Sequence, residues 1–219
     1  MAVRVKVVDA DKPDPQILDE AAGLIAKGRV IVCPTDTGYA FTANGLDMEA
    51  VAMVFNLKGR SFSNPIHVAV NSVEAAGKYA CMNRSAEEIA RRFLPGGLTM
   101  VLPRKEIIPL LLVSGRSTVG IRIPDNRVIL ALAAMTGLPL TATSANISSQ
   151  PAPYSVSEII GQMGSDIKGL AMILDQGIIT SRELSTIIDL TVEPPQLLRQ
   201  GRVSWLELRQ FLDSIRDSG

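Results

Sequence analysis

The stretch Val30-Ile31-Val32-Cys33-Pro34-Thr35-Asp36-Thr37-Gly38 is the clearest indicator of fold in this chain of 219 residues. Residues 30–33 are a short apolar run, which is typical of a buried strand. The run stops at Pro34, and residues 35–38 place small polar groups where the strand ends. Because open α/β sheets bind ligands at the ends of their strands, we expect part of a site here.

The sequence on both sides of this stretch predicts alternating helices and strands. Asp14-Pro15, followed by spaced apolar residues and Gly28, is typical of a helix with Asp14 as its N-cap. We expect further helices after Asp47, from a capping box at Ser85, over 127–136, from Ser155 and from a capping box at Ser204. We expect further strands over 66–70, 98–102, 119–123, 140–143, 172–174, 187–190 and 197–198. The alternation favours a layered α/β fold, and the consecutive strands near the C-terminus favour a mixed sheet.

Length, charge and cysteine content narrow the class of protein. The length fits a single domain, expected over residues 1–219, with one active site. The 22 basic and 22 acidic residues give no net charge, so any anion binding must be local. The apolar runs are much shorter than the roughly 20 residues of a membrane span, and the N-terminus lacks a signal-peptide pattern. We therefore expect a cytoplasmic protein without a membrane segment, with Cys33 and Cys81 reduced.

Cationic and hydroxyl side chains recur at the predicted strand ends. A single histidine, His67, cannot build a multi-histidine metal site, so no metal ligands are predicted. Lysine and arginine suit phosphate and carboxylate groups, and hydroxyls and amides add orienting hydrogen bonds, so together these residues indicate a polyanion site. Taken one at a time, each is as well explained as a turn former or a solvated charge, and the residues alone favour that plainer interpretation. The groups concerned are 34–37, 58–60, 118–122, 144–146 and Arg199.

Seven sequence blocks follow one another along the chain. They are PTDT (34–37), KGRSFSNPI (58–66), PGGLT (95–99), TVGIRIP (118–124), TSAN (143–146), STIIDL (185–190) and LLRQG (197–201). In this series the chain resembles the YrdC-type threonylcarbamoyl-AMP synthases over nearly its whole length. The resemblance implies a three-layer YrdC-like α/β fold around a twisted sheet of parallel and antiparallel strands, with a deep anion-binding cleft.

The same resemblance implies an activity and a set of site residues. The activity is that of a nucleotidyltransferase, which forms threonylcarbamoyl-AMP and pyrophosphate from ATP, bicarbonate and L-threonine for the threonylcarbamoyladenosine (t6A) modification of tRNA. Magnesium is expected to accompany ATP, and Lys58 and Arg60 are expected to neutralise charge on the phosphates. The residues implied to contact ATP are Lys58, Arg60, Thr118, Ser144, Asn146 and Arg199. The residues implied to contact threonine are Thr35, His67, Arg122 and Ser185.

One departure from the family pattern keeps alternatives open. Members commonly read PTDTVYGL at the first block, whereas this chain continues as Gly38-Tyr39-Ala40-Phe41, more like the YciO branch. That branch typically lacks the full set of Lys58, Arg60, Ser144 and Asn146, which this chain keeps, so we favour synthesis. The alternatives are a YciO-like paralogue with a related substrate and an RNA-binding protein without turnover. Binding of tRNA or double-stranded RNA, and transfer of the product by separate partners, are further implications of the family.

Overall fold

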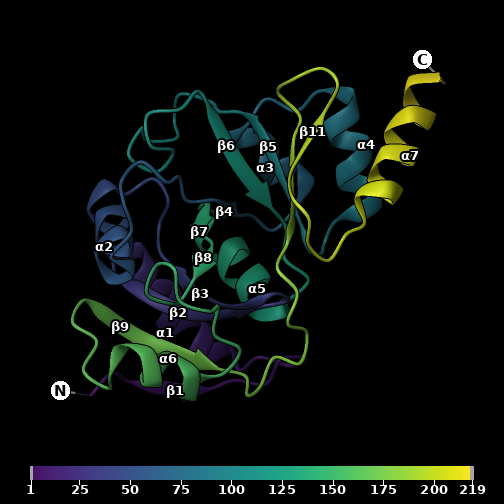
Figure 1. Cartoon of the computed structure of the whole chain (residues 1–219). Helices are drawn as coiled ribbons and strands as arrows, with labels where there is room; N and C mark the ends of the chain where they lie inside the picture. Colours follow the sequence, from purple (N-terminus) through teal and green to yellow (C-terminus); the bar gives the residue numbers. More distant parts are fainter. Residues whose placement is uncertain (1, 218–219) are drawn as a thin grey trace.

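Two mixed β-sheets organise residues 2–217, which the computed structural model describes (Figure 1). The five-stranded sheet has the order β1 (Val5–Val7), β9 (Leu170–Asp175), β2 (Val30–Thr35), β3 (Gly38–Thr42) and β8 (Thr143–Ser144). The six-stranded sheet has the order β11 (Gln196–Arg199), β10 (Thr186–Asp189), β5 (Leu98–Pro103), β6 (Thr118–Arg122), β4 (Val68–Ala69) and β7 (Leu140–Thr141). Each sheet contains parallel and antiparallel pairs. The mixed α/β class is therefore confirmed, with the strands divided between two sheets where one was expected.

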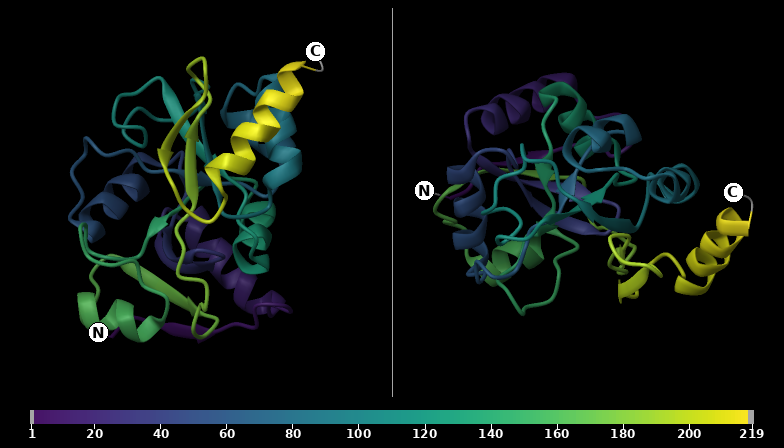
Figure 2. Two further views of the ribbon diagram at one scale, coloured as in Figure 1. Left: turned by 45° about the vertical axis from the view of Figure 1, so that its right-hand side comes forward. Right: turned by 90° about the horizontal axis from the view of Figure 1, so that it is seen from above.

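Helices pack around both sheets. They are α1 (Pro15–Ala26), α2 (Met48–Lys58), α3 (Val73–Tyr79), α4 (Arg84–Phe93), α5 (Arg127–Thr136), α6 (Val156–Met163) and α7 (Trp205–Asp217). Helices α1 and α5 pack together against β2, while α7 packs on α4, where Phe93 and Phe211 meet edge to face at 5.5 Å. Figure 2 shows α7, in yellow, beside α4 and far from the N-terminus. Within residues 2–217, no helix combines the length and the apolar character that crossing a membrane requires.

Side chains at the helix starts explain where most helices begin. The carboxylate of Asp14 accepts a hydrogen bond from Gln16 N at 2.8 Å, as predicted for α1. Helix α4 starts earlier than its predicted capping box, because Asn83 Oδ1 accepts from Ala86 N at 2.8 Å. Ser85, the predicted cap, lies inside the first turn. The sequence offers two capping residues here, and the earlier one is used.

Strand β2 is buried along its whole length. Its residues alternate between two apolar clusters, with Val30 and Val32 in one and Ile31 and Cys33 in the other, where α1 and α5 pack. A continuous apolar run is typical of a strand that is covered on both faces. Thr35 ends this rigid strand, so its hydroxyl is held in a fixed place.

Three connections differ from the sequence prediction. Residues 35–38, expected as polar groups at the end of a strand, form the tight turn of a β2–β3 hairpin in which Thr35 pairs with Gly38. The strand expected over 140–143 divides at Ala142, with β7 in the six-stranded sheet and β8 in the five-stranded sheet. The strand expected over 66–70 is only two residues long. The chain therefore passes from one sheet to the other within a few residues, and this crossing lies where the two sheets meet.

Candidate functional site

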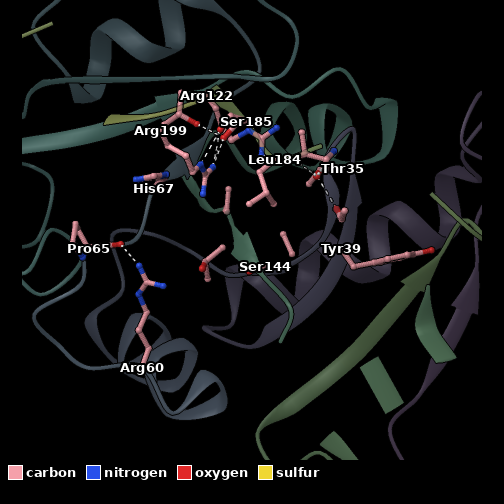
Figure 3. Close-up of a pocket in the computed structure, with 16 residues that line it drawn as sticks. Thr35, Tyr39, Arg60, Pro65, His67, Arg122, Ser144, Leu184, Ser185 and Arg199 are labelled. Atoms are coloured by element: carbon pink, nitrogen blue, oxygen red, sulfur yellow. Dashed lines mark hydrogen bonds between the residues drawn. The ribbon is translucent and has the colours of Figure 1, made fainter. Parts of the chain in front are cut away.

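A polar cavity of about 140 Å³ lies where the chain crosses between the sheets (Figure 3). Each crossing segment supplies lining residues: Arg60, Pro65 and His67 before β4, residues 142–144 around β8, and residues 184–185 before β10. The β2–β3 hairpin closes another side with Thr35 and its neighbours. A cavity of this size suits a small molecule or one part of a larger one.

Strand register brings further polar groups to one face of the six-stranded sheet. Ile187 of β10 pairs with Arg199 of β11 on one side and with Thr99 of β5 on the other. The pairing of β5 with β6 places Arg122 next in the row, because Met100 pairs with Ile121. Paired residues point to the same face of a sheet, so Arg199, Thr99 and Arg122 reach the cavity together.

Arg122 lines the cavity and forms a buried ion pair with Asp36. Its Nη2 donates to Asp36 Oδ1 at 2.7 Å, and its Nη1 donates to Thr37 Oγ1 at 2.9 Å. The two charged side chains are only 7% and 3% exposed. Burial lowers the pKa of Arg122, and the Asp36 carboxylate acts in the opposite direction. Within residues 2–217, Arg122 Nε and Asp36 Oδ2 are buried without hydrogen-bond partners. The site therefore keeps unused hydrogen-bonding capacity beside the cavity.

Arg199 is held by the segment that enters β10. Its Nε and Nη2 donate to Ser185 O at 3.0 and 2.8 Å, and its Nη2 also lies 3.0 Å from Ser185 Oγ. The Ser185 hydroxyl is in turn 2.9 Å from Thr99 Oγ1. Burial lowers the pKa of Arg199, and the nearby Arg122 adds to this. This chain of contacts fixes a second guanidinium group beside the first.

Arg60 approaches the cavity from the loop that follows α2. Its Nε donates to Asn64 O and its Nη2 to Pro65 O, both at 3.0 Å. Figure 3 shows its guanidinium facing the side of the cavity that holds Ser144. The guanidinium is thus held by backbone carbonyl groups of its own loop and lies at the edge of the cavity.

Lys58 lies behind the cavity wall. Its side chain is almost fully buried, and its Nζ donates to Asn146 Oδ1 at 2.6 Å, to Asn146 O at 3.2 Å and to Ser144 O. Ser144 Oγ donates to Asn146 Oδ1 at 2.7 Å. Burial, followed by the charge of Arg60, lowers the pKa of Lys58 to about 7. The four predicted residues thus lie close together. Lys58 and Asn146 lie behind Ser144, and Arg60 lies at the cavity edge.

His67 is the one imidazole of the chain, and it lines the cavity. Burial lowers its pKa to about 3, with further contributions from Arg199, Arg122 and Arg60 in that order. The ring is therefore neutral at physiological pH. A neutral imidazole has one donor and one acceptor nitrogen, whereas guanidinium groups only donate. His67 thus gives this cationic cavity a hydrogen-bond acceptor.

The structure brings together most of the predicted site residues. Seven of them line the cavity: Thr35, Arg60, His67, Arg122, Ser144, Ser185 and Arg199. Lys58 and Asn146 lie directly behind them. Thr118 is different, because it starts β6 and lies four residues, or about 13 Å, from Arg122 along the strand. It shares the face of Arg122 but does not line the cavity.

Sequence reasoning did not assign roles to Asp36, Thr37 and Thr99. All three belong to blocks that the sequence singled out, at 34–37 and 95–99, yet only the pairing of the strands shows which side chains meet. The signal was present for Asp36, since a lone carboxylate between two threonines at a strand end suits a cationic partner. Its partner, 86 residues away, could not be identified without the fold.

Comparisons with known proteins give consistent results. Residues 23–201 match the Sua5/yciO/yrdC family model, which is described as "Telomere recombination". A threonylcarbamoyl-AMP synthase of Pyrococcus abyssi is 38% identical over 197 residues, covering 90% of this chain and 57% of that protein. A putative threonylcarbamoyl-AMP synthase of Methanocaldococcus jannaschii is 34% identical over 198 residues, covering 90% of this chain and 92% of that protein.

Solved structures show the same relationship. P. abyssi Sua5 complexed with L-threonine matches with a TM-score of 0.89 at 35% identity, over 94% of this chain and 60% of that chain. The chain thus spans about three fifths of the length of the P. abyssi proteins it matches. E. coli YciO matches with a TM-score of 0.83 at 24% identity, over 92% of this chain and 97% of that chain, which is a likeness of fold alone. From the family model, the identities and the shared fold, the chain belongs to the Sua5/YciO/YrdC family.

Proposed function

We propose that this protein is an L-threonylcarbamoyladenylate synthase, a nucleotidyltransferase that joins L-threonine, bicarbonate and the AMP part of ATP. The observation that carries the proposal is the convergence of Arg60, Arg122 and Arg199 with a neutral His67 on one small cavity. Within residues 2–217, Arg122 alone among these arginines has a carboxylate partner, so this part of the chain keeps a local surplus of positive charge at the cavity. Such a local surplus suits substrates that bring several negative charges.

The threonine part of the substrate fits the end of the cavity around Arg122. A guanidinium group pairs well with a carboxylate, and the hydroxyls of Thr35 and Ser185 lie on the same lining. The neutral ring of His67 accepts a hydrogen bond from the amine or the hydroxyl of the amino acid. The relative from P. abyssi whose structure holds L-threonine supports this choice of amino acid.

The nucleotide part fits the side formed by Arg60 and Ser144. Lys58 and Asn146 lie behind that wall, and Thr118 and Arg199 complete the set proposed to contact ATP. ATP enters as its magnesium complex. No group of three histidine, cysteine or acidic side chains placed to hold a metal ion occurs within residues 2–217, so the proposal leaves the ion with the phosphates of ATP.

The proposed reaction needs alignment and charge neutralisation. The neutral amine of threonine first forms a carbamate, either with carbon dioxide, which releases a proton, or with bicarbonate, which releases water. A carbamate oxygen then forms a bond to the α-phosphorus of ATP, and the bond to the bridging oxygen of pyrophosphate breaks. Two anions must approach each other, so fixed cations lower the barrier by holding them in line and by stabilising the charge on the phosphate. Arg60 and Lys58 are the proposed groups for this step.

Mass spectrometry of a reaction with ATP, bicarbonate and L-threonine tests the proposal. We expect threonylcarbamoyl-AMP and pyrophosphate, with formation of both reduced by at least about 10²-fold in Arg60→Ala, as for other groups that stabilise a transition-state charge. The matched control is Arg29→Ala, which removes an exposed arginine that does not line the cavity. Equal pyrophosphate release by Arg60→Ala and the parent protein would refute the proposed role of Arg60.

A panel of amino acids separates this proposal from a YciO-like activity. Stimulation of pyrophosphate release by another amino acid, and not by threonine, would assign the chain a different substrate. Filter binding of tRNA and double-stranded RNA over a salt series measures any contact with RNA, which weakens steeply as salt rises. Transfer of the product to tRNA by separate partners, and a cytosolic location, complete the proposal.

A further inference from the structure

His67 and Gly120 lie side by side on the face of the sheet that forms the cavity. Val68 of β4 pairs with Ile121 of β6 in parallel register, and His67 and Gly120 each precede these residues by one. A methyl group built on Gly120 would lie 2.4 Å from His67 Cδ2 and 2.9 Å from His67 Cγ. Carbon atoms in contact are normally about 3.5–4.0 Å apart. The imidazole ring therefore fills the space that any other side chain at position 120 would need.

The backbone of β6 does not itself demand a glycine at this position. Gly120 is absent from the glycines with positive φ, so its conformation is open to alanine. Strand β6 pairs with β5 on one side and with β4 on the other, which holds its backbone in place. An added methyl group must then displace the ring by about 1 Å or more, and the cavity is the open side.

We infer that Gly120 is a positioning residue, whose missing side chain seats the imidazole of His67 against β6 so that its nitrogen atoms meet the substrate. Within residues 2–217, neither ring nitrogen takes part in a side-chain hydrogen bond, and the ring lines the cavity. The inference rests on the proposed function for the identity of that ligand. The seating of the ring is a property of the unliganded protein, and can be measured separately.

Nuclear magnetic resonance of the imidazole tests the seating directly. His67 is the only histidine, so protein labelled with ¹⁵N-histidine gives one imidazole signal set that needs no assignment. We expect the ring resonances to move in Gly120→Ala and to stay in place in Gly77→Ala, where an added methyl group meets nothing within 4 Å. Unchanged ring resonances in a folded Gly120→Ala protein overturn the inference.

Kinetics test the consequence for substrate binding. We expect Gly120→Ala to raise the KM for threonine by roughly 10- to 100-fold, as for a displacement of about 1 Å in a substrate-orienting group, with a much smaller change in the KM for ATP. Gly77→Ala should match the parent in both constants. A threonine KM unchanged in Gly120→Ala overturns the inference. A parent protein without threonine-dependent release of pyrophosphate overturns the proposed function instead, and the ring resonances still decide the seating of His67.

A stability cycle covers the case in which Gly120→Ala folds poorly. If the ring is what the methyl group meets, replacing the ring by His67→Ala relieves the clash. We expect Gly120→Ala to lower the Tm of the parent protein clearly and the Tm of His67→Ala by much less, since contacting residues are not additive. Equal losses of Tm in the two backgrounds overturn the inference.

Discussion

Lys58 has an amine that is enclosed by oxygen atoms of residues 144–146 and is shielded from solvent. Burial and the charge of Arg60 lower its pKa to about 7, so about half of the molecules carry a neutral amine at pH 7. A phosphate group beside this wall favours the charged form and raises the pKa again. Binding of a polyphosphate at this site is therefore coupled to the uptake of a proton.

The coupling gives a calorimetric prediction. At pH 7 we expect the binding of ATP to take up as much as about half a proton per molecule at Lys58, because that fraction is missing in the free protein. Titration in two buffers of different ionisation enthalpy measures the uptake. Lys58→Met should abolish this part of the uptake, and an equal proton uptake by Lys58→Met and the parent would assign the proton to another group.

Arg122 has a structural role besides its proposed role in binding threonine. Removing one partner of a buried ion pair leaves the other charge unpaired, which costs about 3–5 kcal/mol. We expect Arg122→Ala to lower the free energy of unfolding by roughly this amount, because Asp36 is 3% exposed and stays behind. The double variant Asp36→Asn/Arg122→Ala should recover a clear part of the loss in urea denaturation. No recovery in the double variant would show that the packing of Arg122, and not its charge, dominates the loss.

Arg122→Lys separates substrate binding from stability. Lysine keeps a positive charge but loses the planar pair of donors that suits a carboxylate. We expect the KM for threonine to rise about tenfold or more, with little change in the KM for ATP, because Arg122, which lines the cavity, is proposed to bind the carboxylate of threonine. Steady-state kinetics with each substrate varied in turn provide the measurement. A rise in the KM for ATP alone contradicts this placement.

Helix starts show where local sequence is ambiguous. Asn83 and Ser85 are both good capping residues, and the sequence pattern favoured Ser85 because Glu88 follows it at capping-box spacing. The structure uses Asn83, and the helix then buries Ala86, Ile89 and Ala90 on one face. The hydrogen bond from Ala86 N to Asn83 Oδ1 identifies which of these two starts of similar local quality is used.

This assignment can be measured by two alanine substitutions. We expect Asn83→Ala to lower the free energy of unfolding by about 1 kcal/mol, because it removes the acceptor of Ala86 N. Ser85→Ala is the matched control and should change stability by less than about 0.5 kcal/mol, since its site carries no cap. The reverse ranking in thermal or urea denaturation would restore the capping box as the start of α4.

At the scale of the whole molecule, the sequence predicts which residues form the site better than it predicts how they are arranged. The groups that carry Thr35 and Arg122 were identified from polar residues at predicted strand ends, and the block that carries Ser185 was identified from the family resemblance. Their meeting depends on two sheets and on the crossing at Ala142, which a local pattern does not contain. The hairpin at residues 35–38 and the division of 140–143 were missed, because pairing with distant strands decides both.

The stability of the whole fold should depend on pH through His67. Its pKa is lowered from an ordinary value of 6.5 to about 3, so the unfolded chain binds a proton that the folded protein excludes. Stability is then full above pH 6.5 and falls as the pH drops from 6.5 toward 3, by at most about 1.4 kcal/mol per pH unit. We expect His67→Gln to flatten this fall between pH 6.5 and 5 in urea denaturation. An equal dependence of the free energy of unfolding on pH in both proteins would assign the acid sensitivity to groups other than His67.

Strand β6 alternates Thr118, Gly120 and Arg122 on the cavity face with the buried apolar residues Val119 and Ile121 between them. Every second residue of β6 thus faces the cavity side of the sheet, and pairing with β4 and β5 fixes the register of the strand. One residue inserted between 118 and 122 would move the residues after it to the opposite face of the sheet. Apolar side chains would then face the substrate, and a charged side chain would face the core. A substitution changes one of these side chains at a time, whereas a change in the length of this short segment moves several of them to the other face of the sheet at once.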